Sequence, residues 1–167
     1  MTVRVERVFE LPVPPEDVWS FIADAERRAR PISVVEEYEV TGERTAIWHV
    51  SLPIPYLDAT VSIETEDVRV DEPRFVEFVG KSRAMRVVGE HELESTEQGS
   101  RLTNRFTVEG RVPGVENYFA DNLDAELTNL ENAIRESFGL DRIQRVSKPE
   151  ADADDGDGKK KSRWNPF

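Results

Sequence analysis

Cysteine is absent from this sequence of 167 residues, which excludes disulfides, thiolate metal ligands and a thiol nucleophile. No run of about 18 apolar residues occurs either, so we expect no membrane-spanning helix. The N-terminus leads directly into an alternating pattern at Val3 and Val5 and lacks the profile of a signal peptide. These absences make a cytoplasmic location the default expectation, with at most a peripheral contact with a membrane.

Lysine is scarce, because Lys81 and Lys148 are the only two before the last nine residues, whereas arginine is frequent. The net charge is −12 and the sequence pI is about 4.7. A surface of this sign repels phosphates, which argues against nucleic-acid binding. An acidic composition with arginine in place of lysine resembles that of proteins from salt-loving archaea. We therefore predict a haloarchaeal, halophilic protein, the alternative being an ordinary acidic one.

Motifs for catalysis and metal binding are also missing. The sequence contains no Gly-x-Ser-x-Gly nucleophile turn and no glycine-rich phosphate loop. Its two histidines, His49 and His91, are predicted on different faces of their strands, which makes a poor metal site. His49 is expected to point outward, opposite its neighbour Trp48. We expect neither a metal nor a cofactor.

The first part of the sequence predicts one strand, then two short helices, then four strands. Residues 2–11 alternate as a half-buried strand, in which Arg7 falls on the apolar phase and indicates a slip or bulge. Pro15 opens a short helix, and a second one is expected over 24–30. Strands are then predicted over 32–40, 43–52, 57–70 and 74–79. A bulge is expected near Glu66 or Asp67, since Val68 and Val70 carry the apolar face beyond it.

Two longer strands follow, around a turn at 98–100. Odd-numbered residues of 85–93 share one apolar face, as do even-numbered residues of 102–110. His91 and Asn104 are the polar members of these faces, near each other but not directly opposite. They either orient a ligand or simply satisfy polar partners inside the fold. Gly89 and Gly110 indicate either room for a ligand or a bend of a curved sheet.

The last predicted element is a long amphipathic helix over 115–139, with apolar residues spaced three and four apart. Gly139 is a good helix stop. Residues 141–158 read as an acidic, disordered linker and residues 159–167 as a basic and aromatic tail. The tail is either an inert end or a docking segment for a membrane surface or a partner protein. Its candidate docking residues are Lys159, Lys160, Lys161, Arg163, Trp164 and Phe167.

This layout resembles the START-like or SRPBCC superfamily, which includes polyketide cyclases, lipid-transport domains and proteins associated with carbon monoxide dehydrogenase. Residues 12–24 (PVPPEDVWSFIAD) are similar to the family's opening, and residues 99–103 (GSRLT) to its turn before the last strand. One departure is Arg30-Pro31, where relatives often place a tryptophan. The resemblance covers residues 1–140. It implies an α+β helix-grip fold: a curved antiparallel sheet of about six to seven strands around the long C-terminal helix, with two short helices after the first strand.

The resemblance also implies a cavity for an apolar molecule between sheet and helix, although only some members are enzymes. We expect a binding or transport protein for a lipid- or quinone-like molecule rather than an enzyme. The expected wall comprises Trp48, Val61, Val87, His91, Asn104, Phe106, Phe119, Leu123 and Leu127. One alternative is a cyclase or dehydratase in which His91 is the general acid or base, assisted by Asn104. Another is a ligand-free interaction module that acts through its tail.

The halophile hypothesis predicts that stability depends on salt. The free energy of unfolding should rise from low to molar KCl, because salt screens the repulsion within a surface of net charge −12. Urea unfolding at a series of KCl concentrations measures this. Equal stability at every concentration would contradict the hypothesis.

Overall fold

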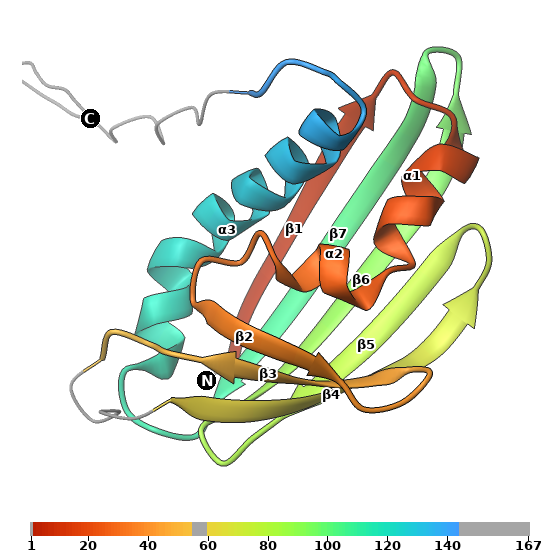
Figure 1. Ribbon diagram of the computed structural model, residues 1–167. Helices are drawn as coiled ribbons and strands as arrows, with labels where there is room; N and C mark the ends of the chain where they lie inside the picture. The colour runs from red at the N-terminus through yellow and green to blue at the C-terminus, as the bar shows by residue number, and fades with distance from the viewer. Residues whose placement is uncertain (1, 55–59, 144–167) are drawn as a thin grey trace, which may run out of the picture.

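The computed structural model describes residues 2–54 and 60–143. In this part of the chain seven strands form one antiparallel sheet, and three helices lie on its concave side (Figure 1). The strands are β1 (Thr2–Leu11), β2 (Val35–Val40), β3 (Thr45–Val50), β4 (Val61–Asp71), β5 (Phe75–Lys81), β6 (Met85–Thr96) and β7 (Gly99–Gly110). The helices are α1 (Pro15–Ile22), α2 (Ala25–Ala29) and α3 (Val115–Ser137).

The strand order is β1-β7-β6-β5-β4-β3-β2, so the chain runs as a meander from β2 to β7 and returns to pair β7 with β1. Figure 1 shows α3 lying along β1 and β7, while α1 and α2 cover the region over β6 and the connection to β2. The sheet curves around this layer of helices. The predicted helix-grip α+β fold is therefore confirmed. The sheet has seven strands, the larger of the two expected numbers.

Helix α3 is held to the sheet by one apolar stripe. Its buried apolar residues are Val115, Phe119, Leu123, Leu127, Leu130 and Ile134, all predicted from their spacing. Burying each large side chain contributes about 1.5–3 kcal/mol relative to leaving it in water. This packing fixes α3 along β1 and β7, at one edge of the sheet.

The two short helices start where local chemistry predicts. Pro15 occupies the first turn of α1, with Glu16 and Asp17 beside the positive end of the helix dipole. The carboxylate of Asp24 caps α2 by accepting a hydrogen bond of 2.9 Å from the backbone N–H of Glu26. Both helices were expected, and α2 is shorter than predicted.

The slip predicted at Arg7 is wrong. Strand β1 pairs with β7 in one continuous register through Arg7, which lies opposite Asn104. The Arg7 guanidinium reaches α3, where it donates to Asp124 Oδ1 at 2.8 Å and to Thr128 Oγ1 at 3.1 Å. A cation on the apolar phase is accommodated because the helix supplies its partners.

Strand β2 begins later than predicted. Its first residue is Val35 rather than Ile32, because the backbone N–H groups of Ile32 and Val35 close turns on the carbonyls of Ala29 and Ile32. The strand expected over 43–52 is observed at Thr45–Val50, and the strand expected over 74–79 at Phe75–Lys81. Residues 55–59, which include the predicted start of the following strand, lie outside the described residues, as does the predicted tail.

A bulge in β4 confirms one prediction and corrects another. The register with β5 shifts between Asp67 and Arg69, as expected near this position. Val68, however, is 47% exposed rather than buried. The half-buried residue at the bulge is Asp67, whose carboxylate accepts a hydrogen bond of 2.6 Å from Arg28 of α2.

Gly89 does not form a bulge, because β6 keeps an unbroken register with both neighbouring strands around it. It lies between Phe78 and Phe106. A Cβ atom at this position would lie 2.2 Å from Cε1 of Phe78 and 3.0 Å from Cε1 of Phe106. The missing side chain makes room for two aromatic rings on the concave face.

We predict that Gly89→Ala destabilises the fold by about 1–3 kcal/mol, since the added methyl group must displace an aromatic ring. Gly42→Ala is the matched control, because its Cβ would meet only the half-buried Thr45 side chain, which can rotate. Denaturant unfolding compares the two variants. Equal stabilities would show that the rings adjust freely.

Candidate ligand-binding site

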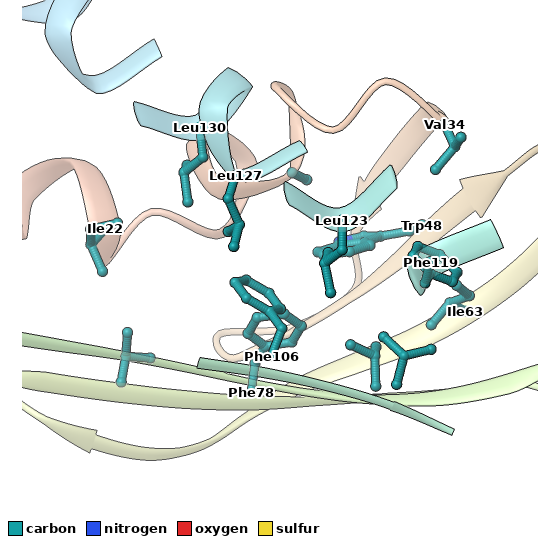
Figure 2. Close-up of a cluster of buried hydrophobic side chains, with 14 of the residues drawn as sticks. Ile22, Val34, Trp48, Ile63, Phe78, Phe106, Phe119, Leu123, Leu127 and Leu130 are labelled. Atoms are coloured by element: carbon teal, nitrogen blue, oxygen red, sulfur yellow. The ribbon is translucent and has the colours of Figure 1, made fainter. Parts of the chain in front are cut away.

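A cavity lies between the concave face of the sheet and α3. Strands β3 to β7, helix α3 and the segment from α2 to β2 line it. Figure 2 shows Phe78 and Phe106 rising from the sheet toward Leu123 and Leu127 of α3, with Trp48 beside them. The volume open to the centres of water-sized molecules is about 60 Å³. One water needs about 10–15 Å³ by this measure, so the space admits a few waters or a compact ligand.

Most of the predicted wall comes together here. The predicted residues that line the cavity are Trp48, Val87, His91, Phe106, Phe119, Leu123 and Leu127. Val61 and Asn104 are buried but do not line it. Ile63, two residues further along β4, contributes to the wall. Asn104 contacts the ring of His91, so it can influence a ligand only by orienting that ring.

The sequence reasoning placed His91 and Asn104 near each other but out of register, and this is wrong. They are a directly opposed pair of β6 and β7. The reason is the turn, because Thr96 pairs with Gly99 and the connecting residues are therefore Glu97 and Gln98.

The side chains of this pair are joined by a hydrogen bond of 2.7 Å between His91 Nδ1 and Asn104 Oδ1. The amide nitrogen of Asn104 donates to the backbone carbonyls of Arg7 at 3.1 Å and Leu102 at 3.4 Å. This network orients the amide so that Oδ1 faces the ring and accepts. His91 therefore carries its proton on Nδ1, and Nε2 has a free lone pair.

The ring of His91 is neutral at pH 7. Burial lowers its pKa to about 3, the positive charge of Arg28 lowers it too, and the hydrogen bond with Asn104 opposes both effects. A neutral imidazole with its proton on Nδ1 offers one acceptor at Nε2.

Arg28 is a cavity residue that the sequence reasoning missed. Its side chain is only 4% exposed, and it donates to Ile22 O at 2.8 Å and to Asp67 Oδ1 at 2.6 Å. Its guanidinium lies 5.5 Å from the centre of the Phe78 ring. Helix α2 is too short to show an apolar period, so no pattern distinguished Arg28 from Arg27 or Arg30.

Glu126 of α3 was missed as well, because carboxylates were expected on the surface. It is buried and lines the cavity. Its carboxylate accepts hydrogen bonds from Ser33 N at 2.8 Å and Ser33 Oγ at 2.5 Å. These bonds fasten the segment between α2 and β2 to α3 beside the cavity.

Three buried polar atoms have no hydrogen-bond partner among the described residues. They are Nε of Arg28, Nε1 of Trp48 and Nε2 of His91. All three side chains line the cavity, and all three contact the ring of Phe78. The first two atoms are donors and the third is an acceptor, so the cavity-lining side chains around Phe78 carry unpartnered groups of both kinds.

His49 lies on the outer face, as predicted. Its ring contacts Glu39 Oε2 at 3.0 Å and Ser62 Oγ at 3.2 Å. Within residues 2–54 and 60–143, no group of three or more histidine and carboxylate side chains could hold a metal ion. In the same part of the chain, no helix has both the length and the apolar character needed to cross a membrane.

A curved antiparallel sheet that holds a long C-terminal helix over an apolar cavity defines a START-like helix-grip protein. Residues 2–135 match the model of the family described as polyketide cyclase / dehydrase and lipid transport, and the chain belongs to that family. None of the curated proteins compared with the sequence matches it significantly.

Solved structures from several organisms share this fold. A protein from Thermus thermophilus is 22% identical, with a TM-score of 0.62 over 82% of this chain and 99% of that one. An aromatase/cyclase from a Streptomyces species is 14% identical, with a TM-score of 0.65 over 80% and 92%. A START superfamily protein from Mycobacterium smegmatis is 11% identical, with a TM-score of 0.64 over 80% and 95%. At these identities the likeness extends to the fold alone.

The buried histidine predicts a pH dependence of stability. The unfolded chain takes up a proton at His91 below pH 6.5 but the folded chain only below about pH 3, so stability falls as the pH decreases between these values. The slope contributed by one such group approaches about 1.4 kcal/mol per pH unit. Above pH 6.5 the effect is absent.

Urea unfolding of the unaltered protein and of His91→Asn, from pH 7 down to about pH 5, tests this expectation. Asparagine keeps a donor toward Asn104 but does not titrate, so the variant should lose this part of the pH dependence. The two proteins differ only at residue 91, so the difference between their curves isolates the contribution of His91. Parallel curves for the two proteins would contradict the depressed pKa.

Proposed function

We propose that this domain binds a small hydrophobic molecule in the cavity between the sheet and α3 and acts as its carrier. The observation that carries the proposal is the wall, in which aromatic and aliphatic side chains from β3 to β7 and α3 surround a small polar group of Arg28, His91 and Glu126. Ligand sites have this composition, with many apolar contacts for affinity and a few polar atoms for orientation. Membership of a family described by cyclase, dehydrase and lipid-transport functions supports the same class of ligand.

The size of the cavity suits a compact ligand or the ring end of a longer one. A volume of about 60 Å³ admits little more than a few waters while the surrounding side chains stay in place. A longer lipid would need the segment between α2 and β2 to separate from α3. The hydrogen bonds of Ser33 with Glu126 oppose that separation.

The enzyme hypothesis, with His91 as general acid or base, is less well supported than the carrier. Acid–base catalysis is most efficient when the pKa of the catalytic group lies near the working pH. A pKa of about 3 makes His91 a weak base at pH 7 and leaves almost no protonated acid.

The hypothesis of an interaction module concerns the tail, residues 159–167, which lies outside the described residues. It stays a hypothesis, which deletion of these residues would test.

We predict that protein purified in high salt carries a stoichiometric apolar compound, which denaturing extraction and mass spectrometry would identify. Leu127→Trp should abolish this occupancy, because the larger ring fills space beneath α3. We expect this overpacking to cost about 1–3 kcal/mol of stability. Val40→Trp, at a position 63% exposed, is the matched control and should retain the compound.

Two results would contradict the carrier function. One is equal occupancy in both tryptophan variants, which would place the compound elsewhere. The other is an empty protein that also binds no apolar compound on titration.

A further inference from the structure

We propose that the ligand carries a hydroxyl group, whose O–H donates a hydrogen bond to Nε2 of His91 and whose oxygen accepts one from Arg28 or Trp48. This inference rests on the proposed function and narrows it. Among lipid- and quinone-like molecules it selects alcohols, phenols and hydroquinones over ketones, ethers and quinones.

Asn104 decides which ring nitrogen of His91 donates a hydrogen bond and which one accepts. If the amide of Asn104 were turned around, its oxygen would face the carbonyl oxygens of Arg7 and Leu102, and both contacts would become repulsive. The observed orientation leaves only the oxygen for His91, so the ring proton is on Nδ1. The ring is also neutral, so Nε2 accepts and cannot donate.

The other two unpartnered atoms are hydrogen-bond donors. The N–H groups of Arg28 and Trp48 are donors, and they belong to side chains that contact the same Phe78 ring as His91. A hydroxyl group is the smallest ligand group that can both donate to Nε2 and accept from an N–H. A ligand without hydrogen-bonding groups would leave all three buried atoms without a partner, which is unfavourable.

Other polar ligands fit the cavity less well. A ketone, ether or quinone oxygen accepts from Arg28 or Trp48 but has no proton for His91. A carboxylate has none either, and the charge of Arg28 is already paired with Asp67 at 2.6 Å. Water can make the same bonds as a hydroxyl, so a hydroxyl that displaces water loses no hydrogen bond, whereas an ether oxygen loses one.

Three probes of similar shape test the inference by isothermal titration calorimetry. These are 4-ethylphenol, 4-ethyltoluene, which replaces the hydroxyl with a methyl group, and 4-ethylanisole, whose oxygen only accepts. We expect 4-ethylphenol to bind about tenfold more tightly than either of the others, the effect of one or two buried hydrogen bonds. Equal or tighter binding of 4-ethyltoluene or 4-ethylanisole would overturn the inference while the proposed function stands. If none of the three probes binds, the inference is overturned, and the extraction experiment decides the proposed function separately.

Two variants locate the effect at Nε2. His91→Asn retains a donor to Asn104 but is too short to place an acceptor at the position of Nε2, so the preference for 4-ethylphenol should disappear while the affinity for 4-ethyltoluene stays. His91→Gln is the matched variant, since its longer amide places an oxygen near the former Nε2, and it should retain part of the preference. Unchanged preference in His91→Asn would overturn the inference.

Nitrogen NMR of the unaltered protein reports on the ring directly and does not depend on the folding of a variant. Nδ1 should show a bonded proton and Nε2 a free lone pair. The Nε2 signal should shift when 4-ethylphenol binds and stay in place with 4-ethyltoluene. A proton found on Nε2 at neutral pH would overturn the inference.

Discussion

The packing of α3 against the concave face of the sheet is the contact on which the rest of the molecule depends. A single stripe from Val115 to Ile134 supplies the apolar surface of the helix, and β1 and β7, along which the helix lies, supply much of the surface below it. The curved sheet and the helix leave a cavity between them, and Phe119, Leu123, Leu127 and Leu130 of this stripe form part of its wall. The candidate site is therefore a consequence of the same packing that stabilises the fold.

Several polar side chains between the helices and the sheet have hydrogen-bond partners of their own. Arg7 binds Asp124 and Thr128, Glu126 binds Ser33, and Arg28 binds Asp67. Each of these contacts also joins a helix to a strand or to a connecting segment, so the polar groups fix how the helices are placed on the sheet. Buried polar groups normally find partners, and the few unpartnered atoms are therefore informative. Here they gather around Phe78, on the wall of the cavity.

His91 illustrates how a second residue sets the chemistry of a first. An isolated histidine could donate or accept from either ring nitrogen and would titrate near neutral pH. Asn104, held by two backbone carbonyls, decides which nitrogen carries the proton, and burial keeps the ring neutral. The unpartnered nitrogen of this cavity-lining ring is an acceptor for this reason. Such a group suits recognition better than proton transfer.

The sequence by itself determined the order of elements, the buried stripe of α3 and part of the cavity wall, because period-two and helical spacing show which residues face inward. It also carried the family resemblance in residues 12–24 and 99–103. Only the tertiary structure decided the opposition of His91 and Asn104, since their register depends on a turn whose position differs from the expected one. It alone brought Arg28, Asp67 and Glu126 into or beside the cavity, because a charge is buried only where distant segments supply its partner, and spacing along the chain does not record those partners.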